Sequence, residues 1–254
     1  MSTPGPGVPY DAAAALSEPQ RLVNIFMAPS KTFLDLRRKP SWWGPWLIAA
    51  LLSVVFAYLV QVKVGYDQVF DTALKMTPRR AEQLDRLPPD QRQQQVEIAT
   101  KITQIAVYCS PLVLLLAGIV VAAVLMATLN VIAASEIGFG TALAVVFYSW
   151  LPPSMVKMVI VLASMLAPGF APEGFNIENP VATNLAALMA FPPSSPALYR
   201  LASAIDILAI WTIILLGLGF SRTSKVKRST ATLIVAGWYA VVTLLGTAWA
   251  ALGS

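Results

Sequence analysis

Two charged side chains, Lys157 and Asp206, stand inside long apolar segments of the chain. If these segments cross a membrane, each charge costs about 2.5–3.5 kcal/mol near the bilayer centre, and such residues commonly face a charged partner or a water-filled cavity. At about 1.5 Å per residue, the two positions fall at similar depths toward the same side. We therefore predict an intramembrane polar site in which they pair directly. In the wider form of this site they share a pocket with one of three polar residues, Tyr148, Ser149 and Asn130.

The alternative for both residues is structural. Lys157 would extend its long side chain so that the ammonium group reaches the membrane interface, and Asp206 would accept hydrogen bonds from nearby backbone. A proton or ion pathway is the less favoured functional form, because one acid and one base do not make a relay.

The rest of the chain offers no set of residues for catalysis or metal binding. It has no histidine and a single cysteine, Cys109, so the commonest general base, the commonest metal ligand and an intrachain disulfide are all missing. It also has no phosphate-binding glycine loop and no nucleophile–base pair. We therefore expect no enzymatic activity, no catalytic residue, no cofactor and no metal site. The net charge of +5 fits a membrane surface, and no nucleic acid partner is expected.

The composition decides which class of protein positions these residues. Of the 254 residues, 57% are hydrophobic and 12% are charged, and the mean hydropathy is +0.66. Soluble domains have about 45–50% apolar and about 25% charged residues, so a soluble enzyme, a disordered chain and a disulfide-rich scaffold are excluded. Five runs are long enough to cross a hydrocarbon core of about 30 Å. We predict spans over residues 43–62, 104–133, 139–166, 201–220 and 231–252.

These runs are almost continuously apolar, which predicts helices and not the alternating strands of a β-barrel. The expected fold is all-α: a polytopic membrane protein with five transmembrane helices and short amphipathic helices at the interface. Residues 1–16 are expected to form a disordered tail and residues 17–252 a single membrane domain. In the last span, the small residues Gly246 and Ala250 favour close contact with a neighbouring helix.

The segment before the first span has helix signals of its own. Ser17 and Gln20 form a capping pair for a first short helix, and a second short helix follows it. Both are basic and amphipathic, and we predict that they anchor the chain in the membrane interface. A lipid-binding or partner-binding face is the alternative.

Two loops also contain helix signals. In the 63–103 loop, Pro78 and Pro89 mark the starts of a solvated helical hairpin, because proline is favoured in the first turn of a helix. In the proline-rich 167–200 loop, a helix is predicted over 180–189. It is too short to span the bilayer, so we expect it to be interfacial or re-entrant.

An odd number of spans places the two termini on opposite sides of the membrane. Lysine and arginine are nearly equally numerous on the two sides, but on one side they cluster directly before the first span, at 37–39, and in the short 221–229 loop. By the positive-inside rule this side is cytoplasmic. The N-terminus is therefore expected in the cytoplasm and the C-terminus outside.

Several motifs, in their order along the chain, resemble those of the Yip1 family of five-span membrane proteins, in its bacterial branch. Trp43-Gly44-Pro45 is similar to the end of the family's Asp-Leu-Tyr-Gly-Pro element, with Ser41 at the acidic position. Tyr148-Ser149-Trp150-Leu151-Pro152 resembles the Tyr-Ser-x-x-Pro element of the third span. The segment before the first span resembles the family's usual entry at Ile25-Phe26, Pro29, Phe33, Leu36 and Pro40. Looser matches near the end are Asp206, Trp211 and the basic 222–228 loop.

What this resemblance implies about function is modest. Eukaryotic members engage small GTPases and shape vesicle membranes, but bacteria lack that machinery, so the trafficking function is not carried over. The resemblance implies an integral scaffold or accessory subunit of the bacterial inner membrane that acts without catalysis. Its expected partners are the lipid bilayer and either another membrane protein or a second copy of the chain. The alternative is a component of a transporter or channel that uses the polar site around Lys157 and Asp206.

Overall fold

A computed structural model describes residues 15–253, and in this part of the chain the regular structure is helical, without a β-strand. The all-α prediction is therefore confirmed. The helices, in chain order, are α1 (Glu18–Met27), α2 (Pro29–Arg38), α3 (Trp43–Lys63), α4 (Tyr66–Lys75), α5 (Pro78–Asp85), α6 (Pro89–Tyr108), α7 (Ser110–Ala133), α8 (Phe139–Leu166), α9 (Pro196–Ala204), α10 (Ile207–Thr223) and α11 (Arg228–Gly253), with the 3-10 turns η2 (Pro172–Gly174) and η3 (Leu185–Leu188). The tail predicted over 1–16 lies outside the described residues, except for its last two positions.

Four of the described helices, α3, α7, α8 and α11, are long and apolar enough to cross a membrane, and each falls on a predicted span. The fourth predicted span, 201–220, is divided, because α9 ends at Ala204 and α10 begins at Ile207. With 17 residues, α10 is about 25 Å long. The second predicted span began too early, since a break at Cys109 separates α6 from α7, whose first turn contains Pro111.

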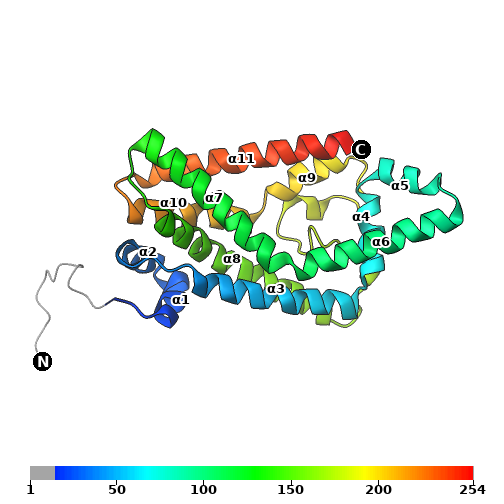
Figure 1. Cartoon of the computed structure of the whole chain (residues 1–254), viewed down its shortest axis with the longest axis horizontal. Coiled ribbons are helices and arrows are strands. Elements are labelled where there is room, and N and C mark those ends of the chain that lie inside the picture. Colours follow the sequence, from blue (N-terminus) through cyan, green and yellow to red (C-terminus); the bar gives the residue numbers. More distant parts are fainter. Residues whose placement is uncertain (1–14, 254) are drawn as a thin grey trace, which may run out of the picture.

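The long helices lie side by side in one bundle (Figure 1). At one end lie α1 and α2, together with the α7–α8 and α10–α11 turns, whereas α4, α5, α6 and the C-terminal end of α11 lie at the other end. The central helix is α8, which packs against α3, α7 and α10, and its residues 142–149 are all buried. A helix that is apolar all round is expected to be surrounded by other helices in this way.

The N-terminal helices α1 and α2 bury part of their apolar surface against protein, while Val23 and Met27 of α1 stay exposed. Ile25, Phe33 and Leu36 are at most 1% exposed and belong to the same core as α8 and α10. The α2 helix packs against α10 and α8, and α1 packs against α2 and α8. The capping signal is confirmed, since the Ser17 N–H donates a hydrogen bond to Oε1 of Gln20 at 2.9 Å.

Three helices follow the first span at the far end of the bundle. As the proline signals predict, α5 begins at Pro78 and α6 begins at Pro89. The additional helix α4 is tied to the first span, because the Tyr66 hydroxyl donates a hydrogen bond to the Ala57 carbonyl of α3 at 3.1 Å. Burial, with a smaller effect of Tyr108, raises the pKa of Tyr66 to about 12.

The helix predicted over 180–189 does not form. The described chain is irregular there apart from η3, and its backbone pairs with the break between α9 and α10. The Leu185 N–H donates to the Ile205 carbonyl and the Ile207 N–H donates to the Thr183 carbonyl, both at 3.2 Å. An interrupted helix leaves backbone groups free, and in an apolar environment these must find partners. The 180–189 loop supplies these partners, and its backbone groups that bond the helix break cannot also form the hydrogen bonds of a helix within the loop.

Candidate functional site

The predicted pair of charges is not formed among the residues that the structure describes. The Asp206 carboxylate accepts hydrogen bonds from the Leu208 backbone N–H at 2.7 Å and from the Thr183 hydroxyl at 3.0 Å. Asp206 is thus the N-cap of α10, which is the structural alternative for this residue, and it lies at the break between α9 and α10. Lys157 is half-buried on α8 and forms no ion pair within residues 15–253.

The other polar candidates do not complete an intramembrane site either. Asn130 closes the α7–α8 turn, where its amide accepts a hydrogen bond from the Ile137 N–H at 2.9 Å and donates one to the Ile137 carbonyl at 3.0 Å. The Ser149 hydroxyl is buried and has no hydrogen-bond partner in the described part of the chain. Tyr148 lies about 13 Å along α8 from Lys157, at about 1.5 Å per residue.

Tyr148 instead contacts a cluster of charged side chains that was not predicted from the sequence. Its hydroxyl donates a hydrogen bond to Oε1 of Glu18 in α1 at 2.7 Å. The other carboxylate oxygen of Glu18 lies 3.3 Å from Nη1 of Arg21. Both Nε and Nη2 of Arg21 lie 2.6 Å from Oδ2 of Asp35 in α2. A continuous chain of charge-assisted hydrogen bonds, the Glu18–Arg21–Asp35 cluster, therefore joins α8, α1 and α2.

This cluster is buried. The side chains of Arg21 and Asp35 are each 3% exposed, and that of Glu18 is 15% exposed. A buried ion pair offsets its desolvation only if its remaining polar atoms are also bonded, and here Oδ1 of Asp35 accepts a hydrogen bond from the Leu16 N–H at 3.1 Å. The cluster holds two carboxylates for one guanidinium, so removal of Arg21 would leave two carboxylates inside the protein without their cation.

Gly44 allows α1 to approach the start of the first span. A Cβ atom at this position would lie 2.5 Å from Oε1 and 2.9 Å from Cγ of Glu18. Because Tyr148 and Arg21 hold the Glu18 carboxylate in place, only glycine leaves room for it here. The neighbouring Pro45 is buried as well.

One signal in the sequence could have indicated this cluster. Asp35 lies on the buried side of α2, together with Thr32 and Phe33. A carboxylate on the apolar face of an amphipathic helix is costly unless a cation pairs with it, so its position predicts a partner. That this partner is Arg21 depends on how α1 crosses α2, which residue spacing does not reveal.

The match to known sequences spans nearly the whole chain, with residues 23–250 matching the Yip1 domain. The chain belongs to the Yip1 family. Membrane protein YknW of Bacillus subtilis (strain 168) is similar to it, with 24% identity over 232 residues that cover 91% of this chain and 87% of YknW. No solved structure gives a significant match. The family resemblance that the motifs predicted is confirmed, and this Yip1 protein is a membrane protein with several apolar helices.

Two of the Yip1 motif positions, Gly44 and Tyr148, meet at the Glu18 carboxylate. Ser41 stands where the eukaryotic motif has its acid, and its hydroxyl is buried without a hydrogen-bond partner in the described chain. In this Yip1 protein, the Glu18 carboxylate of α1 lies beside Gly44, the glycine of the motif. The remaining motif positions make other contacts: Pro29 starts α2, Trp43 is 54% exposed at the start of α3, Pro152 is buried in α8, and Trp211 is half-buried on α10.

Proposed function

We propose that this Yip1 protein is a non-catalytic accessory subunit or scaffold of the bacterial inner membrane that binds a second membrane protein or a second copy of itself. The observation that carries the proposal is the projection of α5 and α6 beyond the rest of the bundle (Figure 1). The exposed surface at the tip of this hairpin is polar and includes the glutamine-rich stretch 91–95 at the start of α6, whereas Ile98, Ile102 and Ile105 are exposed further along α6. Surface segments held out by a rigid scaffold are common sites of binding.

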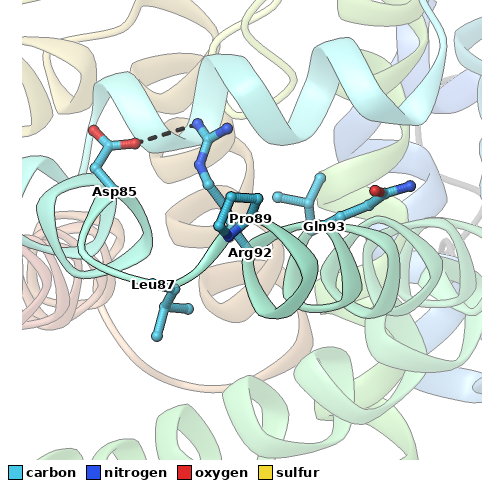
Figure 2. Close-up of a pocket in the computed structure, with 6 residues that line it drawn as sticks. Asp85, Leu87, Pro89, Arg92 and Gln93 are labelled. Atoms are coloured by element: carbon cyan, nitrogen blue, oxygen red, sulfur yellow. Dashed lines mark ion pairs between the residues drawn. The ribbon is translucent and has the colours of Figure 1, made fainter.

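Figure 2 shows the tip of this hairpin, where α5 turns into α6 and the side chains of Asp85 and Arg92 point toward each other. Their charged groups lie 3.2 Å apart, and the side chains are 68% and 54% exposed. An ion pair this exposed contributes at most about 1 kcal/mol, so a partner can displace it at low cost. Leu87 and Val96 line the same hollow and provide apolar contact area beneath the polar surface.

The packing of the bundle supports a structural function more than a transport function. The buried run 142–149 fills the centre, and the Phe147 ring lies 5.9 Å from that of Trp42 and 5.8 Å from that of Trp150. Aromatic rings at these separations belong to a close-packed interior. A solute path would require a polar route through this region of α8.

We further propose that five segments cross the bilayer, with α9 and α10 together forming the fourth. Both pack along α11, so the pair covers the membrane thickness that α10 alone does not. The positive-inside rule then places α1, α2 and the basic clusters in the cytoplasm, and α4–α6 outside. Val23 and Met27 are 63% and 82% exposed on α1, and they would dip into the lipid interface beside the contacts with protein.

Photo-crosslinking in intact membranes tests the scaffold proposal. A photoreactive amino acid is placed at Gln91 or Gln94 on α6 and, as a matched control, at Leu245 on α11, which is 67% exposed on the lipid-facing surface. We expect the hairpin positions to give one discrete crosslinked protein and the control position to give none. Hairpin positions without a product, or with the same products as Leu245, would contradict the proposal.

A component of a transporter or channel is the second candidate, and the break in front of α10 favours it. Interrupted helices at membrane depth occur at the substrate and ion sites of transporters. In this case the site around Lys157 and Asp206 would contact the solute. Solute flux through the purified protein alone in liposomes, reduced by Asp206→Asn, would support this candidate and overturn the scaffold proposal.

A further inference from the structure

A groove lies at the end of the bundle opposite the Glu18–Arg21–Asp35 cluster. It is bounded by α4, α5, α9 and α11 and by the loop around 176–179, and its volume is about 650 Å³. Ligand sites in proteins commonly measure about 300–1,000 Å³. The groove has a polar side and an apolar side, and the two differ in what they can bind.

Two arginines form the polar side, Arg80 of α5 and Arg200 of α9. One carboxylate, that of Glu178, lies 3.7 Å from Arg200, and both of these side chains are more than half exposed. The groove therefore keeps a net positive charge. Asn176 also lines the groove, and its Nδ2 group is buried without a hydrogen-bond partner in the described part of the chain. An unpaired buried donor costs about 1–3 kcal/mol, so its presence indicates a missing acceptor.

The apolar side belongs to the lipid-facing surface of α11. Val242 and Trp249 line the groove and are 63% and 78% exposed. Tryptophan is enriched at the depth of the lipid headgroups, so the two arginines lie near the level of the lipid phosphates. Gly246 lies between Val242 and Trp249 on α11 and leaves room for the Arg200 guanidinium, because a Cβ atom at this position would lie 3.1 Å from Nε of Arg200. The small residue that predicted a close helix contact lies where α11 packs against α9, and it faces the Arg200 side chain.

We propose that this groove binds the phosphate headgroup of an anionic phospholipid, with one acyl chain lying along α11. The guanidinium groups of Arg80 and Arg200 and the amide of Asn176 donate hydrogen bonds to the phosphate oxygens. Because the groove borders the lipid-facing surface at Val242 and Trp249, the lipid enters sideways from the bilayer. This assignment is independent of the partner of the α5–α6 hairpin.

Native mass spectrometry of the full chain in detergent tests the proposal, with phosphatidylglycerol titrated in parallel with phosphatidylcholine. We expect phosphatidylglycerol to bind more tightly than phosphatidylcholine. Arg80→Gln or Arg200→Gln should each weaken phosphatidylglycerol binding roughly fivefold, which is the contribution of one basic side chain near an anionic membrane surface, and the two together should weaken it roughly 25-fold. The matched control, Arg86→Gln with Lys101→Gln, removes two charges from exposed positions outside the groove and should leave the affinity unchanged.

Two further measurements test whether the ligand is a lipid or a free headgroup, and whether a loss of affinity comes from the groove itself. Glycerophosphoglycerol, the same headgroup without acyl chains, is expected to bind much more weakly than the lipid. Gly246→Leu fills the groove without changing its charge and should weaken phosphatidylglycerol binding while phosphatidylcholine binding, and the elution volume of the protein, stay unchanged. Equal affinity for the two lipids, a double groove variant that matches the control, or a headgroup that binds as tightly as the lipid would each overturn the proposal.

Discussion

Tyr148 in α8 donates a 2.7 Å hydrogen bond to Glu18 in α1, although 130 positions separate the two residues in the chain. Through Glu18, this bond connects the central helix of the bundle to the buried ion pair between Arg21 and Asp35. The α1–α2 hairpin is therefore part of the folded membrane domain, and both its apolar face and its buried charges hold it there.

The ion pair in this cluster should behave as a unit. Arg21→Met alone leaves Glu18 and Asp35 without a cation, and we expect a loss of about 3–5 kcal/mol in the stability of the α1–α2 hairpin. Asp35→Leu leaves Arg21 paired with Glu18 and should cost less. The double variant, Arg21→Met with Asp35→Leu, removes the more buried pair and leaves Glu18 with its hydrogen bond from Tyr148, so it should recover part of the loss caused by Arg21→Met. Amide hydrogen exchange of residues 18–38 measures the effect, as a fall in protection that is largest in the Arg21 variant and is partly reversed in the double variant.

The control for this prediction is the ion pair between Arg86 and Glu82, whose side chains are 80% and 68% exposed. The corresponding variants, Arg86→Met and Glu82→Leu, should change stability by less than about 1 kcal/mol. If the double variant of Arg21 and Asp35 is as unstable as the worse single variant, the pair does not act as a unit.

Tyr148→Phe removes the hydroxyl that bonds Glu18 and keeps the ring. A hydrogen bond to a charged group contributes about 1.5–3 kcal/mol, so we expect a loss of this size in hairpin stability, again measured by hydrogen exchange of α1. Tyr58→Phe serves as the control, since Tyr58 is 59% exposed on α3. Unchanged protection of α1 in the Tyr148 variant would show that the hydrogen bond does not hold the hairpin.

Gly44→Ala should displace Glu18, because the new methyl group would lie 2.5 Å from its Oε1 atom. We expect a loss of about 1 kcal/mol or more, together with loss of the bond to Tyr148. Since both substitutions break the same contact, Gly44→Ala combined with Tyr148→Phe should cost less than the sum of the two. As a control, Gly237→Ala meets no atom within 4 Å and should be neutral or stabilising by up to about 1 kcal/mol. Strict additivity in the cycle would argue against a shared contact.

Two variants at Asp206 separate the effect of its N-cap hydrogen bond from the effect of its negative charge. Asp206→Ala removes the acceptor for the Leu208 N–H, and loss of an N-cap costs about 1 kcal/mol. Asp206→Asn retains an acceptor and should stay close to wild type, as measured by hydrogen exchange in the first turn of α10. If the asparagine variant is as unstable as the alanine variant, the negative charge matters more than the cap.

The proposed orientation predicts which cysteines a membrane-impermeant maleimide reaches in intact cells. In a chain with Cys109→Ala, a cysteine at Gln93 on the α5–α6 hairpin should be labelled from outside, whereas one at Lys225 in the α10–α11 turn should react only after the membrane is opened. Labelling in the reverse pattern would place the N-terminus outside. Labelling of both positions in intact cells would contradict the odd number of spans.

The long helices and their approximate ends could be predicted from the sequence, because they depend on local composition. About 20 successive apolar residues suffice to predict α3, α7, α8 and α11, and Pro78 and Pro89 set the starts of α5 and α6. The division of the fourth span could not be predicted in this way. An aspartate in an apolar run looks the same whether it stands inside a helix or caps the start of one.

By itself, the sequence determined that this is an all-α membrane protein of the Yip1 family, since hydropathy and the order of short motifs are properties of the chain alone. Only the tertiary structure decided which polar groups meet. A buried polar group bonds whichever partner the packing brings within about 3 Å. Helix packing brought Thr183 to Asp206 and Glu18 to Tyr148, and it left Lys157 without the predicted aspartate. These choices depend on contacts between distant segments, which no local pattern of residues contains.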